Sequence, residues 1–75
     1  MRTYSIILEP DEEDGGYTVL APALPGCVTQ GETVEECLEN AQEAIAVWIR
    51  SAERFGEPVP IERQPPRIPQ VQVAA

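Results

Sequence analysis

The sequence contains no histidine and no lysine, and this absence limits the chemistry that it can support. Without these side chains there is no Ser–His pair, no amine that could form a Schiff base and no lysine of a phosphate-binding Walker motif. Its glycine pairs are typical of turns, because no GxGxxG pattern connects a strand to a helix. These absences predict a protein that is not an enzyme and that needs no cofactor.

Cysteine is also scarce, with two residues, Cys27 and Cys37, that lack the CxxC spacing of a zinc site. Cys27 follows a predicted turn, and Cys37 lies among the apolar positions of a predicted helix, where cysteine is usually a small hydrophobic residue. The chain has no secretory signal that would favour disulfide formation. We therefore expect neither a disulfide nor a metal site.

Long apolar segments are absent as well. No run approaches the roughly 20 residues that a membrane-spanning helix needs, and the N-terminus has no basic segment followed by an apolar one. These features predict a cytoplasmic protein that does not enter a membrane. Residues 1–75 are expected to form a single domain, and a chain this short removes only about 60% of its unfolded surface from water. A second copy or a partner would add to its stability.

Negative charge dominates the composition. Asp and Glu number 13 against five arginines, which gives a formal net charge of −8. Nucleic-acid binding needs cationic side chains that neutralise phosphates, so direct binding is not expected. An acidic surface serves either solubility or attraction to a basic protein. The candidate contact residues for a basic partner are Asp11, Glu12, Glu13 and Asp14 in a predicted loop and Glu35, Glu39 and Glu43 on a predicted helix.

The segment 33–56 carries the strongest structural signal. Apolar residues recur every three or four positions from Val34 to Phe55, as in an amphipathic helix. Thr33 is a favourable N-cap, and Glu36 stands where a capping box needs it. Gly56 can adopt the left-handed conformation that ends many helices. We expect one helix over residues 33–56.

A three-stranded meander is expected within residues 1–31. Alternating apolar residues predict strands at residues 2–9 and 17–21, joined by the acidic loop. If Glu9 lies opposite Gly16, one apolar face of this hairpin meets the helix. A third short strand, residues 28–30, follows a turn and is ended by Gly31. That turn consists of Leu24, Pro25, Gly26 and Cys27, in which Pro and Gly suit the centre of a type II turn.

The C-terminal part contains several prolines. Residues 57–67 predict an extended linker, and residues 68–74 predict a fourth strand whose pairing begins after Pro69. The element order is then β-β-β-α-β, an α+β domain with one long helix packed on a mostly antiparallel sheet. On the sheet face away from the helix, and in the last strand, lie the candidate oligomer residues Ile7, Leu20, Val71 and Val73. A homodimer or a higher homo-oligomer is expected.

The same element order begins the ribonuclease H fold, in which carboxylates from the strands and the helix hold two metal ions. Here the first strand offers only serine and threonine between its apolar residues, and the last strand offers Gln70 and Gln72. No two-metal site is therefore expected. The acidic loop 11–14 lacks the alternating oxygen ligands of an EF-hand, so calcium binding is not expected either.

The run from Tyr17 to Thr33 resembles the HicB-like antitoxin family. Its most specific part, residues 24–31, reads Leu-Pro-Gly-Cys-Val-Thr-Gln-Gly, and residues 56–60 are also similar. The resemblance covers residues 3 to about 60. It implies a degenerate ribonuclease-H-like fold without catalysis and a role in neutralising a small basic HicA-type toxin that cleaves mRNA.

Many members of that family continue into a helix-turn-helix or ribbon-helix-helix module that binds operator DNA. Residues 1–75 contain no such module, so direct binding to DNA is not expected of them. Two alternatives remain open. The chain could be a stand-alone structural or regulatory module that only self-associates, with no toxin partner, or a vestigial enzyme. A neighbouring gene for a short basic protein with a single histidine would favour the antitoxin interpretation.

Overall fold

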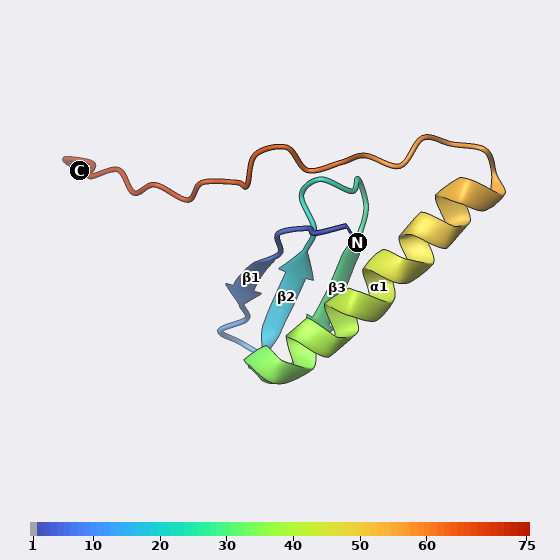
Figure 1. Ribbon diagram of the computed structural model, residues 1–75. Coiled ribbons are helices and arrows are strands. Elements are labelled where there is room, and N and C mark those ends of the chain that lie inside the picture. The colour runs from blue at the N-terminus through green and yellow to red at the C-terminus, as the bar shows by residue number, and fades with distance from the viewer. Residues whose placement is uncertain (1) are drawn as a thin grey trace.

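The computed structural model describes residues 2–75, which form a three-stranded sheet covered on one face by a helix (Figure 1). Strands β1 (Ile7–Pro10), β2 (Tyr17–Leu20) and β3 (Val28–Gly31) are antiparallel neighbours in the order β1-β2-β3, and helix α1 (Val34–Arg54) follows. The predicted α+β class is confirmed. The ribonuclease-H-like assignment stays a prediction. Among the described residues, no helix is long and apolar enough to span a membrane.

Thr33 and Gly56 set the two ends of α1, as predicted, but only the Thr33 half of the predicted capping box is formed. The Thr33 hydroxyl accepts a hydrogen bond of 3.1 Å from the backbone N–H of Glu36. At the other end Gly56 has φ +71°, and its N–H donates to the Glu53 carbonyl at 3.1 Å. The next N–H, of Glu57, donates to the Ala52 carbonyl at 2.8 Å, which completes a Schellman motif.

We expect Thr33→Ala to lower the free energy of unfolding by about 1 kcal/mol, because one N–H of the first helical turn loses its acceptor. For a domain of this size that is a fall of about 4–8 °C in Tm. Thermal unfolding followed by circular dichroism measures the change. Thr3→Ala, at an exposed position before β1, is the control. Equal Tm values for the two variants would show that the cap does not stabilise the helix.

The hairpin register differs from the predicted one by two residues. Glu9 lies opposite Thr18 rather than Gly16. In the structure the strands extend to the pair Pro10 and Tyr17. The loop between them closes because the Asp11 N–H donates to the Gly16 carbonyl at 3.0 Å and both Gly15 (φ +77°) and Gly16 (φ +71°) adopt left-handed conformations. A two-residue shift keeps every side chain on its predicted face.

The first strand is also shorter than predicted. It begins at Ile7 instead of residue 2, because its partner Leu20 is the last residue of β2. Before Ile7 the backbone bonds to a side chain instead of a strand, because the Ser5 N–H donates to Glu62 Oε1 at 2.9 Å. The Ser5 hydroxyl donates to the other carboxylate oxygen at 2.6 Å. A single glutamate thus anchors the chain that returns from the helix.

Two clusters of buried residues form the core between the sheet and α1. One consists of Val19, Cys37 and Ala41, and the other of Ala21, Leu24 and Cys27. The ends of the predicted apolar stripe stay exposed, with 47% of Val34 and 70% of Phe55 accessible. The reason is length, since the 21 residues of α1 span about 32 Å and four-residue strands only about 13 Å.

The fourth strand predicted for residues 68–74 is not formed, so the order in this chain is β-β-β-α. The Tyr4 hydroxyl donates to the Pro60 carbonyl at 2.6 Å, and together with the Glu62 contacts this bond holds residues 60–62 beside the residues that precede β1. From residue 63 onward every residue is exposed, and the extended segment runs away from the sheet (Figure 1). Three prolines between residues 65 and 69 lack the N–H that a ladder needs, which explains why the segment finds no partner in its own chain.

Candidate functional site

Acidic residues from two segments converge at the end of the molecule where α1 begins. A hollow of about 240 Å³ lies between the hairpin loop and the helix start. Asp11 and Asp14 line it from the loop, and Glu32 and Glu36 line it from the other side. We call these four carboxylates and their hollow the acidic hollow. Four like charges around one depression attract a cationic partner.

The loop that carries half of these acids is held in a fixed shape. One Asp11 carboxylate oxygen accepts from the backbone N–H groups of Glu13 at 3.0 Å and Asp14 at 3.1 Å. Gly16 packs so closely that a Cβ atom there would lie 2.7 Å from the Gly31 carbonyl oxygen. The loop is therefore docked on the turn that precedes α1. A docked loop loses less conformational entropy on binding than a mobile one.

The sequence prediction named some of these residues and missed others. Asp11 and Asp14 belong to the acidic hollow, whereas Glu12 and Glu13 are exposed on the same loop. Glu36 was expected only as part of a capping box, and Glu32 was not a candidate. Both approach the loop through the contact between Gly16 and Gly31, a tertiary contact that leaves no local signal in the sequence.

The predicted helix acids lie elsewhere. Glu35, Glu39 and Glu43 follow one another at four-residue intervals and are exposed, so they form a stripe along α1. Neither Glu35 nor Glu39 lines the acidic hollow. Glu43 lines a second depression, which lies between β3 and α1. The structure therefore separates the predicted contact residues into a loop group and a helix stripe.

The turn of residues 24–27 is a type II turn, as predicted. The Cys27 N–H donates to the Leu24 carbonyl at 3.0 Å, and Gly26 has φ +78°. The indole N–H of Trp48 donates to the Pro25 carbonyl at 2.9 Å and fixes the turn to α1. Sequence reasoning missed this bond, because helical periodicity places Trp48 on the apolar face but does not show where its N–H points.

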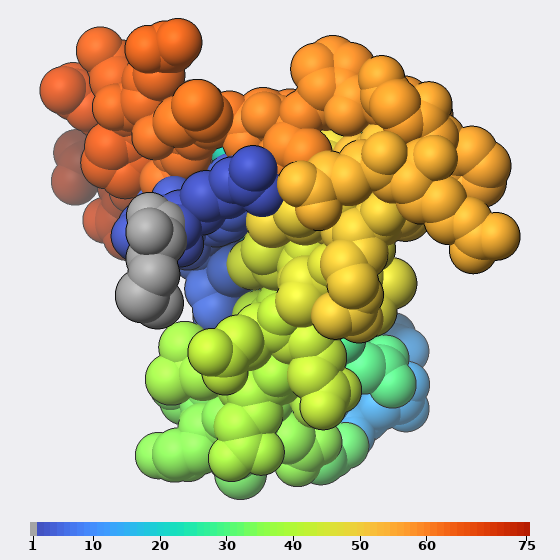
Figure 2. All heavy atoms as spheres, turned by 45° about the vertical axis from the view of Figure 1, so that its right-hand side comes forward, coloured from blue at the N-terminus to red at the C-terminus, as the bar shows by residue number. Residues whose placement is uncertain are grey.

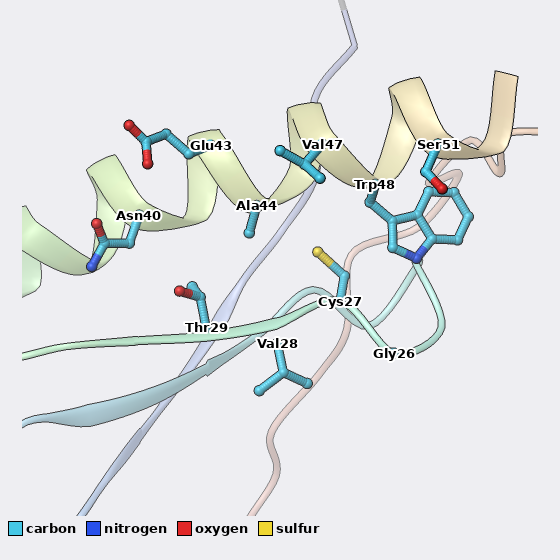
Figure 3. A pocket seen from close by; sticks show the side chains of 10 residues that line it. All are labelled: Gly26, Cys27, Val28, Thr29, Asn40, Glu43, Ala44, Val47, Trp48 and Ser51. Carbon is cyan, nitrogen blue, oxygen red and sulfur yellow. The ribbon is translucent and has the colours of Figure 1, made fainter. Parts of the chain in front are cut away.

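A groove of about 530 Å³ lies between β3 and α1 (Figure 3). Ala44 and Val47 line it from the helix, and Thr29 lines it from the sheet. Val28 lines it too, although in Figure 3 its side chain points away from the helix. The Asn40 amide reaches across the groove and donates to the Gln30 carbonyl at 2.7 Å. Val47 is 56% exposed, so the groove presents apolar surface to solvent.

The two cysteines are free thiols inside the core. Burial raises the pKa of Cys37, and the negative charges of Glu36 and Glu32 raise it further. Burial also raises the pKa of Cys27. Both thiols are therefore protonated near neutral pH and are poor nucleophiles and metal ligands. Within residues 2–75, no group of three or more His, Cys, Asp or Glu side chains is placed to hold a metal ion.

Most of the chain is similar in sequence to one known protein family. The model of a family described as the HicB_like antitoxin of a bacterial toxin–antitoxin system matches residues 4–72. A UPF0150 protein of Thermoplasma acidophilum is 49% identical over 57 residues, which are 76% of this chain and 81% of that protein. A UPF0150 protein of Synechocystis sp. is 46% identical over 59 residues, covering 79% of this chain and 73% of that protein. Antitoxin HicB 1 of Photorhabdus laumondii is 41% identical over 58 residues, which are 77% of this chain but only 37% of that protein.

Proposed function

Because the chain belongs to the HicB-like antitoxin family of bacterial toxin–antitoxin systems, we propose that it neutralises a small basic HicA-type toxin that cleaves mRNA. The family match over residues 4–72 carries this proposal. The chain would act by stoichiometric binding and would not turn over a substrate. A protein that cuts RNA needs cationic side chains to hold phosphates, and these are the natural partners of an acidic binding protein.

The acidic hollow supports the proposal physically. Its carboxylates and the exposed Glu12 and Glu13 put negative charge at one end of a chain whose net charge is −8. Carboxylates that contact the toxin's basic surface would exclude RNA phosphates from it, because both anions need the same cations. The long-range field acts mainly on the rate of encounter, whereas short-range contacts set how long the complex lasts.

Neutralising the acids of the loop tests whether their charge acts on the association rate and not on the dissociation rate. The fourfold variant Asp11→Asn, Glu12→Gln, Glu13→Gln and Asp14→Asn keeps the shape and hydrogen-bond acceptors of the loop. We expect association with the toxin to slow by about tenfold at low salt, with a flatter salt dependence and a nearly unchanged dissociation rate. Stopped-flow measurements at several ionic strengths give both rates.

The control for this variant is Glu53→Gln with Glu57→Gln, which neutralises exposed acids near the other end of α1. Its association rate is expected to change by less than about twofold, because charges far from the contact are screened beyond roughly 10 Å. The control removes two charges and the loop variant four. Slowing by the control that is about half of the loop variant's on a logarithmic scale would show that net charge alone acts, and that the acidic hollow is not the docking end.

Co-expression with the neighbouring gene tests the function itself. If that gene encodes a short basic protein, its expression alone is expected to arrest growth, and co-expression of this chain is expected to restore growth. The two proteins should then co-purify in a fixed ratio. Growth arrest that persists despite a soluble, folded chain would contradict the antitoxin proposal.

A second candidate function is a self-associating module with no toxin partner. The observation that favours it is a row of apolar residues on the sheet face opposite α1, where Ile7 lies opposite Leu20 and Leu20 opposite Val28. The first two were predicted oligomer residues, and Val28, which is 54% exposed, joins them in the structure. Pull-down from the native cell that returns only the chain itself would support this alternative.

A further inference from the structure

The C-terminal segment 63–75 is the least packed part of the described chain. Because this segment is extended, the radius of gyration of the molecule is 14.4 Å, compared with about 11 Å for a compact domain of 75 residues. The accessible surface is 6275 Å², whereas a compact monomer of 8.2 kDa exposes about 4,500 Å². Figure 2 shows this segment spread out from the body. The excess exceeds the roughly 800 Å² that one partner contributes to a standard interface.

Side chains in this segment carry the pattern of a strand. Val71 is 82% exposed and Val73 is 77% exposed, and they alternate with Gln70 and Gln72. Pro69 cannot donate a hydrogen bond, so ladder pairing can begin only after it. Four residues, 70–73, are thus available to pair, and they match the four residues of β3 in length.

The edge of β3 offers a place for such a strand, since β3 lies at the border of the sheet. The Ala21 N–H donates to the Cys27 carbonyl at 3.1 Å, so by antiparallel alternation the backbone groups of Val28 and Gln30 point to the outer edge. Asn40 already donates to the Gln30 carbonyl. Three backbone groups remain at this edge, the N–H and the carbonyl of Val28 and the N–H of Gln30. They face the groove between β3 and α1.

We propose that residues 70–73 of a second copy of this chain add to β3 as an extra strand within this groove. Val71 and Val73 of the incoming strand would face α1 and cover Ala44 and the exposed Val47. The two glutamines would lie on the sheet face that carries Val28. Backbone hydrogen bonds supply affinity in this mode of strand addition, and the alternating side chains supply specificity.

Charge favours a second copy as the occupant. All 13 acidic residues lie within residues 1–62, whereas residues 63–75 contain Arg63 and Arg67 and no acid. The tail of one copy is therefore complementary to the body of another, and Glu43 lines the groove that receives it. A reciprocal exchange of two tails closes a twofold dimer with two identical contacts.

The path of the chain argues against the tail entering its own groove. Glu62 holds the start of the tail at Ser5, on the β1 side of the sheet, and β3 is the opposite edge. From there the tail leads away from β3 (Figure 1). A return would need a reversal within a segment that has three prolines and no glycine after Gly56.

Substitutions in the tail test the proposal on the full chain. Gel filtration with light scattering at about 50 µM, well above the Kd of a micromolar dimer, is expected to give twice the chain mass of 8.2 kDa. The double variant Val71→Glu with Val73→Glu is expected to halve that mass. Gln70→Glu with Gln72→Glu adds the same charge to the other face of the strand and loses the same attraction to the acidic body, but it keeps both valines, so more of the double mass is expected to remain than in the valine variant. All four positions are exposed in the single chain, and far-ultraviolet circular dichroism confirms folding.

A cross-linking experiment identifies the groove. A Val47→Cys chain is mixed with a tagged Val73→Cys chain and treated with a short thiol cross-linker, while the native thiols stay buried. A linked product that contains one chain of each kind is expected. A wild-type mass of one chain, a double mass that survives the valine substitutions, or no mixed product would each overturn the proposal. None of these outcomes involves the toxin, so the proposed function stands or fails separately.

Discussion

Replacing Gly31 by alanine is expected to lower the free energy of unfolding by about 3 kcal/mol, a large part of the stability of so small a domain. Gly31 is buried where β3 passes under the first turn of α1. A Cβ atom there would lie 2.8 Å from the backbone nitrogen of Cys37 and 2.8 Å from its Sγ atom. A backbone atom cannot rotate away as a side chain can, so the whole start of the helix would have to move off the sheet.

Gly15→Ala is the matched control for this substitution. Gly15 has φ +77°, which is unfavourable for alanine by about 1 kcal/mol, but no atom beyond the two adjacent residues lies within 4 Å of the added Cβ. Urea unfolding of the two variants therefore separates backbone strain from collision. If Gly31→Ala shifts the midpoint no more than Gly15→Ala does, the helix does not pack on Gly31 as closely as the structure shows.

Features that depend on neighbouring residues in the chain were predictable from the sequence. The helix ends are of this kind, because Thr33 and Gly56 act on backbone groups within a few positions of themselves. The sheet faces are too, because alternation assigns them whatever the register. The register itself was wrong by two residues, since it depends on how tightly the loop closes at Asp11 and Gly16, and many residue combinations close such loops.

Features that depend on tertiary contact were not predictable. Gly31 was expected only to end a strand, yet its lack of a side chain is what lets Cys37 approach. The acidic hollow forms only where the hairpin meets the helix start, so the sequence did not predict that Glu32 belongs to it. The prediction of a fourth strand was wrong for the single chain for a related reason. Alternation at Val71 and Val73 indicates a strand but does not indicate which sheet edge receives it.

Leu24→Ala is expected to lower the free energy of unfolding by about 3 kcal/mol, within the usual 2–5 kcal/mol for a buried leucine. Leu24 is 1% exposed and packs in the cluster that also holds Ala21 and Cys27. Leu38→Ala removes the same atoms from a side chain that is 56% exposed and should change stability by less than about 0.5 kcal/mol. Urea midpoints of the two variants give the comparison.

The result decides what the turn of residues 24–27 does. A buried Leu24 cannot touch a partner, whereas Pro25 and Gly26 are exposed beside the groove. If the turn is a structural element, Leu24→Ala weakens the fold while its folded fraction binds the toxin as tightly as the unchanged chain. The opposite result would be a Leu24→Ala chain that is as stable as the Leu38→Ala chain but binds the toxin more weakly. It would mean that the turn contacts the partner and that the core does not depend on Leu24.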